Sequence, residues 1–201
     1  VPYFEIVTTT THKTLRGPRS ALIFSRRDAR QFGSLAPSDP AHRGVASRGD
    51  TRTVSLSSLI DKAVFPGLQG GPHLNQIASV AVALAEAARP EFKKYTKQII
   101  KNARALAGEL KKLGWRLVSD GTDSHLILVD TWMEGKGVSG KEASDRLEKA
   151  GIIVNKNTIP FDTRSPVDPS GIRLGTAAET TRGKKEGDMK KIAQKINKIL
   201  R

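Results

Sequence analysis

The sequence predicts a mixed α/β protein, and three observations lead to this prediction. Two short apolar runs near the N-terminus, residues 4–8 and 21–25, flank a polar loop and have the composition of strands. Two longer segments in the middle of the chain have the character of helices, one rich in Ala and Val with almost no charge and the other with apolar residues at helical spacing. Short strand-like and helix-like segments then alternate to the C-terminus, which is typical of a compact α+β unit.

The first part of the chain contains two segments that are rich in turn-forming residues. Residues 26–53 are rich in Arg, Ser, Asp, Gly and Pro, and we expect a long, partly mobile loop there. Apolar spacing returns over residues 54–64. Residues 66–72 then contain two prolines and three glycines, which disfavours a helix and predicts a fixed turn with exposed amides.

Two helices are expected in the middle of the chain. Residues 77–88 are rich in Ala and Val and carry almost no charge, which predicts a buried helix that Pro90 stops or kinks. Residues 91–113 repeat apolar side chains every three or four positions with lysines between them, and Gly114 ends this second helix. We place a domain boundary along the second helix.

The last third of the sequence alternates between strand and helix signals. Strands are predicted over residues 115–118, 126–130, 152–154 and 172–175. Ser139 and Glu142 form a capping box that opens a helix through residue 150, and Gly151 closes it. A final helix carries an apolar stripe from Met189 to Leu200.

The composition of the chain excludes several classes of protein. The 201 residues are 37% apolar, enough for a packed core, and no stretch approaches the roughly 20 apolar residues of a membrane span. The first residues lack the pattern of a signal peptide, so we expect a cytoplasmic protein that does not contact membranes. With no cysteine, disulfides and thiolate metal sites are excluded. Motifs for other metal sites, serine hydrolases and nucleotide phosphates are also missing from the sequence.

The net charge of +14 raises the possibility of nucleic-acid binding. However, the positive charge is spread over three tracts, and two of them lie on predicted amphipathic helices where lysines form a solvated face. We therefore do not expect specific nucleic-acid binding. A basic rim around a phosphate or a polyglutamate tail fits this distribution better.

Lys13 is the first candidate catalytic residue. It follows four threonines and His12 on a short loop between two predicted strands, where the end of a sheet can hold an amine in a pocket. A lysine forms an imine readily when part of it is neutral, and partial burial beside Arg16, Arg19 or His12 would lower its pKa toward that state. The alternative is that Lys13 is one of many surface lysines.

Two further segments carry candidate binding residues. Gly70 and Gly71 precede a helix that begins near Asn75, and such paired glycines let backbone amides approach an anion, although an ordinary Gly-Pro turn is the commoner explanation of this pattern taken by itself. Arg173 lies within a short apolar strand, where an arginine either faces a cleft and binds a carboxylate or forms an internal salt bridge. His73 and His125 are expected to be structural.

Two of these segments resemble one known family. Residues 8–19 read TTTTHKTLRGPR and closely resemble the cofactor-lysine segment of the serine hydroxymethyltransferases, and residues 64–72, VFPGLQGGP, are similar to the same family's pattern. The resemblance implies the C-terminal part of a pyridoxal-phosphate-dependent transferase of fold type I. Residues 1–90 would then be the end of the large cofactor-binding domain. Residues 91–201 would form a bridging helix and a small α+β domain.

The resemblance also implies roles for individual residues. Lys13 would hold pyridoxal 5'-phosphate, and His12, Thr10 and Arg19 would contact the cofactor or tune its reactivity. Gly70 and Gly71 would bind the cofactor phosphate of a neighbouring subunit, which implies a homodimer with shared sites.

The second half of the chain would supply the substrate contacts. Arg173 would hold the carboxylate of serine or glycine, and Arg182 matches another family arginine. Asn157 would contact the pterin ring of tetrahydrofolate, since an amide offers both a donor and an acceptor. The remaining folate contacts implied by the family are Ser165, Pro166 and Val167.

The implied activity is the interconversion of serine and glycine with transfer of a one-carbon unit to tetrahydrofolate. The resemblance covers only the C-terminal half of such an enzyme, so we expect a fragment that needs the missing N-terminal half and is inactive in isolation. Two alternatives remain open: a basic module that binds RNA or a protein partner, and another enzyme of the same fold type, such as a threonine aldolase. The folate-like loop over residues 155–166 argues against the aldolase.

Overall fold

The computed structural model describes residues 3–26 and 55–201. The chain divides into two compact units, Val1–Ala88 and Arg89–Arg201, and each is described by itself. Apart from Arg26, the long loop expected over residues 26–53 lies outside the described residues.

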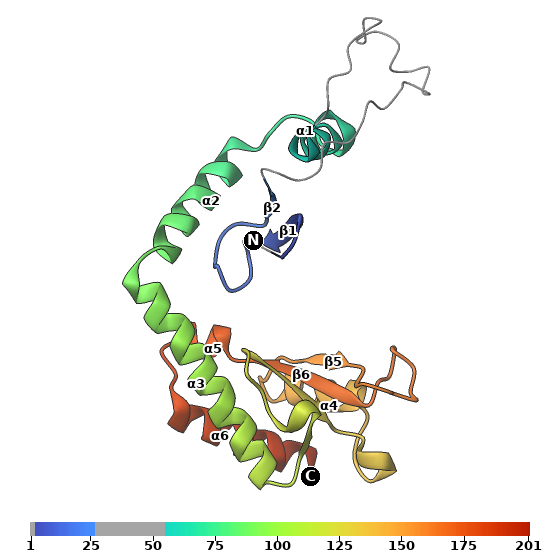
Figure 1. Cartoon of the computed structure of the whole chain (residues 1–201). Helices are drawn as coiled ribbons and strands as arrows, with labels where there is room; N and C mark the ends of the chain where they lie inside the picture. The colour runs from blue at the N-terminus through green and yellow to red at the C-terminus, as the bar shows by residue number, and fades with distance from the viewer. Residues whose placement is uncertain (1–2, 27–54) are drawn as a thin grey trace, which may run out of the picture. The chain divides into compact units, whose positions relative to one another are not determined.

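Unit 1 begins with a β-hairpin (Figure 1). Strand β1 (Ile6–Thr10) pairs antiparallel with β2 (Ala21–Ser25), and Ile6 lies opposite Ser25. The second strand was predicted correctly. The first begins and ends two residues later than predicted, because its β-branched threonines extend the ladder to the Thr10–Ala21 pair.

Two short helical segments follow in unit 1. Helix α1 (Leu56–Lys62) is capped by the Ser55 hydroxyl, which accepts a hydrogen bond from the Ser58 amide at 3.2 Å. A wide turn, η2 (Ala63–Leu68), then contains Pro66. The prediction that residues 66–72 exclude helical structure is therefore wrong for its first residues. The backbone leaves the helical conformation at Phe65, so Pro66 can begin a new turn.

Helix α2 (Leu74–Ala87) is present but is not the buried helix that its composition predicts. Ala83 is its one buried residue, and Ile77 and Val82 are 57% and 60% exposed. Within the described part of unit 1, its neighbours are a two-stranded hairpin and the short segment containing α1 and η2. These elements are too small to cover every face of a 14-residue helix.

Unit 2 begins with the long helix α3 (Pro90–Lys112), as predicted. Arg89 precedes the helix in an extended conformation, and proline is favoured at the first helical position because its missing N–H needs no partner there. At the other end, Gly114 adopts a φ of +84°, the left-handed conformation that terminates a helix.

A four-stranded antiparallel sheet forms the centre of unit 2, in the order β3-β4-β6-β5. Its strands are β3 (Arg116–Leu117), β4 (Leu126–Asp130), β6 (Gly171–Gly175) and β5 (Asn155–Asn157). Short turns, η3 (Val118–Asp120) and η4 (Met133–Gly135), flank β4. Three strand predictions are confirmed within one residue at each end.

The predicted strand over residues 152–154 is wrong. The strand is Asn155–Asn157, in register with β6 through the pair Asn155–Arg173. Ile152 instead donates its amide to the Leu147 carbonyl at 2.8 Å, as part of the exit from the preceding helix. Ile152 and Val154 pack against the core, so their apolar character reflects burial and not strand pairing.

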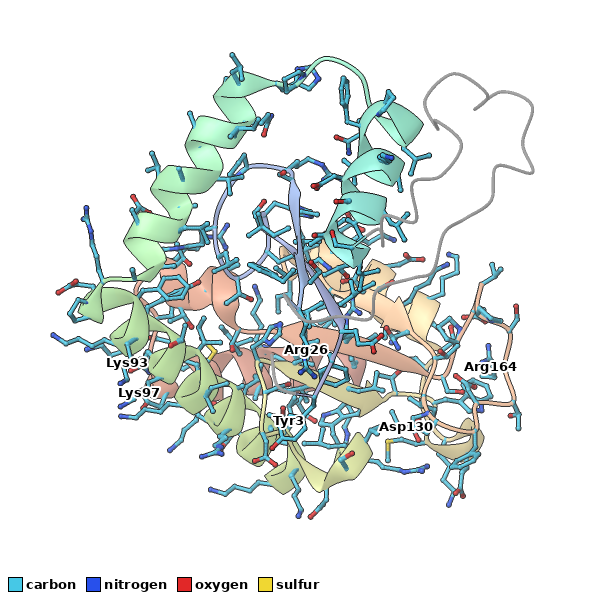
Figure 2. The ribbon with its side chains drawn as sticks, turned by 45° about the horizontal axis from the view of Figure 1, so that its top comes forward. Tyr3, Arg26, Lys93, Lys97, Asp130 and Arg164 are labelled. Carbon is cyan, nitrogen blue, oxygen red and sulfur yellow. The ribbon has the colours of Figure 1, made fainter. Side chains whose placement is uncertain are left out.

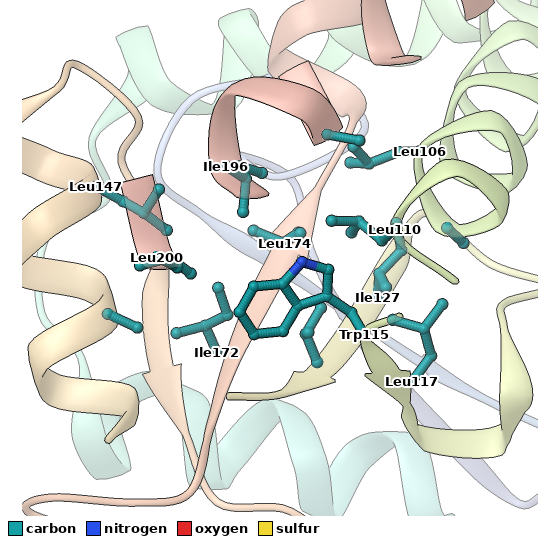
Figure 3. Packing of buried hydrophobic residues seen from close by; sticks show 14 of the residues in the cluster. Leu106, Leu110, Trp115, Leu117, Ile127, Leu147, Ile172, Leu174, Ile196 and Leu200 are labelled. Carbon is teal, nitrogen blue, oxygen red and sulfur yellow. The ribbon is translucent and has the colours of Figure 1, made fainter. Parts of the chain in front are cut away.

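Three helices cover one face of this sheet, and together they form the core of unit 2 (Figure 3). They are α3, α4 (Gly140–Lys149) and α6 (Glu186–Leu200), while the short α5 (Ala177–Thr181) follows β6. Ile127 and Val129 of β4 and Ile172 and Leu174 of β6 point into this core. Because side chains alternate along a strand, Leu128 and Arg173 lie on the opposite face.

The helix ends of unit 2 also follow the sequence signals. The Ser139 hydroxyl accepts the Glu142 amide at 3.2 Å, which begins α4, and Gly151 adopts a φ of +78° just after it. The apolar stripe predicted from Met189 to Leu200 is the buried side of α6. Unit 2 is thus the α+β unit expected from the alternation of its elements.

Candidate active site

The loop that carries Lys13 is closed by a buried threonine. Thr11 is 1% exposed, and its hydroxyl reaches the carbonyls of Pro18 at 2.7 Å and Ser20 at 3.0 Å. Its backbone amide also donates to Ser20, and its carbonyl accepts the Gly17 amide at 2.8 Å. The sequence analysis did not single out Thr11, and a run of four threonines gives no signal as to which one is buried.

Gly17 lets this loop pack closely against α2. A Cβ at this position would lie 3.0 Å from the Thr11 carbonyl oxygen and 3.1 Å from the Cβ of Ala83. A larger residue would therefore push the loop away from the helix. Ala83, the buried residue of α2, is thus the point where the helix supports the lysine loop.

Lys13 lies on the loop between the two strands, as expected, but it is exposed. The expected partial burial is wrong for this chain, because Thr11 and Gly17 make the closing contacts while Lys13 stays at the outer edge. Arg16 starts the return of the loop with a φ of +58°, and its amide donates to the Lys13 carbonyl at 2.9 Å. Arg19 is exposed as well.

His12 is half-buried beside Lys13, and its Nδ1 is a buried atom without a hydrogen-bond partner among the described residues. A buried polar atom without a partner costs free energy, so the position is unfavourable unless a ligand or another chain supplies one. Thr10, at the end of β1, precedes these residues and is also half-buried.

Gly70 and Gly71 lie in an exposed segment before α2, and a Cβ at either position would meet nothing within 4 Å. Packing against the described residues of unit 1 therefore does not require glycine at these positions. His73, at the N-terminal end of α2, accepts the amides of Gln76 and Ile77 through its carbonyl, which fits the structural role expected for it.

Arg173 is exposed on the face of the sheet opposite the core. Its Nη2 lies 3.4 Å from Oδ1 of Asn155 on the neighbouring strand β5. Within residues 3–26 and 55–201, no carboxylate forms an ion pair with it, so the internal salt bridge left open by the sequence does not occur there. Its guanidinium is available to an anion from outside unit 2.

The folate residues implied by the sequence lie on one connection, between β5 and β6. Asn157 ends β5 and donates from Nδ2 to the Thr158 carbonyl at 2.7 Å. Further along, Ser165 Oγ accepts the Val167 amide at 3.3 Å, and Lys156 Nζ donates to the Val167 carbonyl at 2.6 Å. Ser165, Pro166 and Val167 are all exposed, and are accessible to a ligand.

Asp162 is the charged centre of this connection, and the sequence analysis did not identify it. Its carboxylate accepts the amides of Ile159 at 3.2 Å, Arg164 at 2.9 Å and Ser170 at 3.0 Å, and the Ser170 hydroxyl at 2.7 Å. Desolvation by burial acts to raise the pKa of Asp162, but these hydrogen bonds outweigh it and lower the pKa to about 2. The pair Pro160 and Asp162 is a combination typical of turns, so the sequence signals a turn at this point but not its hydrogen bonds.

Comparison with protein-family models decides the family. The model described as serine hydroxymethyltransferase matches residues 1–196. The chain belongs to this family.

A curated relative from Acidobacterium capsulatum, named serine hydroxymethyltransferase, is 50% identical over 200 residues. The match covers 100% of this chain but 40% of that relative. The chain therefore spans less than half the length of this serine hydroxymethyltransferase.

The candidate site residues of this family member fall into two groups. The lysine loop of unit 1 brings together Thr10, His12, Lys13 and Arg19, with Gly70 and Gly71 in a separate segment of the same unit. Unit 2 brings together Arg173 with the folate residues, on the open face of the sheet and the β5–β6 connection.

The residues that the structure describes contain neither a metal-binding cluster nor a membrane-spanning helix. Within these residues, no group of three or more His, Cys, Asp or Glu side chains is arranged to hold a metal ion. Among the helices that the structure describes, none combines the length and the apolar character needed to cross a membrane.

Arg182 pairs with Glu179 on α5, which fits a structural role for this arginine.

Proposed function

We propose that the protein to which this chain belongs interconverts serine and glycine, with transfer of a one-carbon unit to tetrahydrofolate and with pyridoxal 5'-phosphate as cofactor. The observation that carries the proposal is the loop of Lys13, which Thr11 closes and which presents an exposed lysine within a segment that resembles the family's cofactor-lysine segment. Serine hydroxymethyltransferases are PLP-dependent transferases, so this amine is the group expected to hold the cofactor.

The residues of unit 1 fit such a cofactor. Lys13 provides the exposed amine, and His12 provides a buried ring nitrogen whose partner is missing among the described residues. Thr10, at the end of β1, and Arg19, on the loop before β2, flank them in the sequence. The cofactor supplies the electron-accepting ring that allows the bond between Cα and the hydroxymethyl group of serine to break.

A shared site explains the two glycines that unit 1 does not require. Gly70 and Gly71 have exposed backbone and open space in place of a side chain, as a phosphate from a neighbouring subunit needs. We therefore propose that the protein is a homodimer. We also propose that it is cytoplasmic and that residues 1–90 are the end of the cofactor-binding domain of fold type I. Residues 91–201 form the bridging helix and the small domain of this proposal.

Unit 2 binds the substrates in this proposal. Arg173 holds the carboxylate of serine or glycine through its planar guanidinium, which matches a carboxylate in two parallel hydrogen bonds. Asn157, Ser165, Pro166 and Val167 contact tetrahydrofolate. Since the chain spans 40% of its relative, we expect the 201 residues alone to lack a complete site and to be inactive.

The first experiment replaces Lys13 in the parent protein, meaning the full-length protein that contains this chain. Lys13→Ala should reduce tetrahydrofolate-dependent conversion of serine by at least about a thousandfold and remove the absorption band of lysine-bound cofactor. Lys136→Ala, at another exposed lysine, is the matched control and should change neither. A colourless parent protein that shifts RNA in a salt-sensitive way would instead support the basic binding module.

The second experiment tests Arg173. Arg173→Lys keeps the charge but removes the fork, so the KM for serine should rise by at least about tenfold while the KM for tetrahydrofolate stays within about twofold. Arg104→Lys is the control, because Arg104 is exposed and pairs with Asp123 on the surface. Full activity without tetrahydrofolate on threonine, and none on serine, would favour a threonine aldolase.

A further inference from the structure

We propose that Asp162 is the positioning residue that fixes the folate-binding connection between β5 and β6. This inference rests on the proposed function, and it concerns a residue that would shape the folate site without touching the reacting atoms. It draws on three observations: the hydrogen bonds of Asp162, the clamp formed by Arg164 and Asp168, and the conformation of Phe161.

The Asp162 carboxylate ties the beginning of the connection to its end. Oδ2 accepts the amides of both Ile159 and Ser170, which are 11 positions apart in the chain. Oδ1 accepts the Arg164 amide and the Ser170 hydroxyl. Four donors converge on one ionised group, and such hydrogen bonds are about twice as strong as those between neutral groups.

A second set of contacts clamps the segment that holds Ser165, Pro166 and Val167. The Arg164 side chain donates to the Asp168 carbonyl at 3.1 Å and forms an ion pair with its carboxylate. Its guanidinium also lies 4.1 Å from the centre of the Trp132 ring. Figure 2 shows Arg164 at the edge of unit 2, in the same region as Asp130 at the end of β4.

The base of the connection is attached to β4 and η4 through Ser170. Its carbonyl accepts the amides of Thr131 and Trp132, each at 3.0 Å, while its own amide and hydroxyl bind Asp162. Ser170 is 4% exposed, so a change at this contact is not compensated by water. Through Ser170, Asp162 thus links the exposed segment that holds Ser165, Pro166 and Val167 to the end of β4.

Phe161 adopts an unfavourable backbone conformation, which indicates that the contacts around it fix the path of the connection. Phe161 has a φ of +61° and is fully exposed, so its side chain gains nothing from packing in this unit. A bulky residue in this region costs on the order of 1–3 kcal/mol unless its surroundings enforce it. Two contacts on either side of Phe161 hold it in this conformation. The Asp162 amide donates to the Ile159 carbonyl at 3.1 Å, and the Ile159 amide donates to Oδ2 of Asp162.

The hydrophobic core of unit 2 is separate from this arrangement. Neither its buried cluster nor the side chains packed against that cluster include any residue between 155 and 171. A change at Asp162 is therefore expected to alter the connection while leaving the core packed. This separation makes a loss of positioning distinguishable from a loss of folding.

The kinetic test uses Asp162→Asn in the parent protein, with Asp145→Asn as the control. Asp145 is an exposed aspartate on α4 that pairs with Lys141. We expect the KM for tetrahydrofolate to rise by at least about tenfold in Asp162→Asn, with the KM for serine within about twofold, and no change in the control. An unchanged KM for tetrahydrofolate, or an equal rise in both KM values, overturns the inference.

A second measurement uses hydrogen exchange in the parent protein. In Asp162→Asn, the backbone amides of Ile159, Arg164 and Ser170 should exchange with solvent at least about tenfold faster, while those of β4 keep their protection. Ser170→Ala, which removes one of the four hydrogen bonds, should show a smaller effect of the same kind. Unchanged exchange at all three amides overturns the inference.

The two proposals fail in different ways. A wild-type parent protein that does not act on serine and tetrahydrofolate refutes the proposed function, and the folate role of Asp162 with it. An active wild-type protein whose Asp162→Asn variant keeps its KM for tetrahydrofolate refutes only the positioning role.

Discussion

The side chain of Asn102, fully buried on α3, donates from Nδ2 to the Thr180 hydroxyl oxygen on α5 at 2.8 Å. The same Nδ2 donates to the Lys184 carbonyl at 2.9 Å, and Oδ1 accepts from Gln98 at 2.9 Å. The Thr180 hydroxyl in turn donates a hydrogen bond to the Thr176 carbonyl at 2.7 Å. One amide in the middle of an apolar helix stripe therefore joins α3 to α5 and to the start of α6.

Replacing Asn102 should strongly destabilise unit 2. Asn102→Leu leaves the Lys184 carbonyl without this donor in a part-buried position, so the free energy of unfolding should fall by about 2–3 kcal/mol. Both tryptophans of the chain, Trp115 and Trp132, lie in unit 2, and their fluorescence in urea reports on this unit. Gln194→Ala is the control.

Gln194 forms its amide hydrogen bond to Glu109 on the exposed side of α3 and α6, so its loss should cost less than about 0.5 kcal/mol. Equal effects of the two variants would show that the buried network adds no stability beyond an ordinary surface contact.

Thr11→Val should loosen the lysine loop. The variant keeps the size of the side chain but removes the hydroxyl that reaches Pro18 and Ser20, so local opening should become easier by about 1–2 kcal/mol. The Gly17 amide, which donates to the Thr11 carbonyl, should then exchange with solvent about tenfold faster.

Thr9→Val provides the comparison, because Thr9 is exposed and, among the described residues, its hydroxyl reaches only the Thr10 carbonyl, at 3.5 Å. If Thr9→Val accelerates Gly17 exchange as much as Thr11→Val does, the hydroxyl of Thr11 does not hold the loop.

Two glycines of unit 2 should respond in opposite ways to alanine. At Gly140, a Cβ would collide with the backbone carbonyl of Gly171 and lie 3.0 Å from the Pro169 carbonyl oxygen, so Gly140→Ala should destabilise by about 2 kcal/mol or more. At Gly108 on α3, a Cβ would meet nothing within 4 Å, so Gly108→Ala should stabilise by about 0.5–1 kcal/mol. Urea unfolding measures both, and a stabilising Gly140→Ala would contradict the close approach of α4 to β6.

The stabilising effect of Asp162 should disappear in acid. Its pKa is about 2 in the folded chain against an ordinary value of 3.8, so the ionised carboxylate stabilises the folded state above about pH 4. This contribution, about 1 kcal/mol after screening by water, should be lost as the pH falls from 4 toward 2. Unfolding of wild type and Asp162→Asn at pH 6, 4 and 2.5 tests this.

The difference in unfolding free energy between these two proteins should be largest at pH 6 and smallest at pH 2.5. A difference that does not change with pH would mean that the ionised form of Asp162 has no special hydrogen bonding in the folded chain.

Local signals explain which parts of the structure could be predicted. The 3.6-residue repeat, Pro90, Gly114 and the Ser139 cap act within one or two helical turns, and the helices they define were predicted closely. Strand β4 also followed from its own apolar run. Lys13 and Arg173 were proposed as site residues because their segments resemble the family, and their position on a short loop and in an apolar strand suits such roles.

Other features depend on which segments meet in space. Residues 152–154 have the composition of a strand, but they pack as the exit of α4, and the pairing with β6 falls on the polar residues 155–157. Helix α2 has a buried composition, but the described part of unit 1 provides little surface to cover it. Asp162 could not be identified, because its importance arises from Ser170, eight residues further along the chain.

The sequence by itself determined the four longest helices (α2, α3, α4 and α6), the hairpin, the lysine loop and the resemblance to the family, because these depend on residue type and spacing over short distances. Only the tertiary structure decided the register of β5, the exposure of Lys13 and α2, and the roles of Thr11, Asn102 and Asp162. The physical reason is that burial and hydrogen-bond partners are properties of a folded neighbourhood, and local residue patterns do not specify which groups converge there.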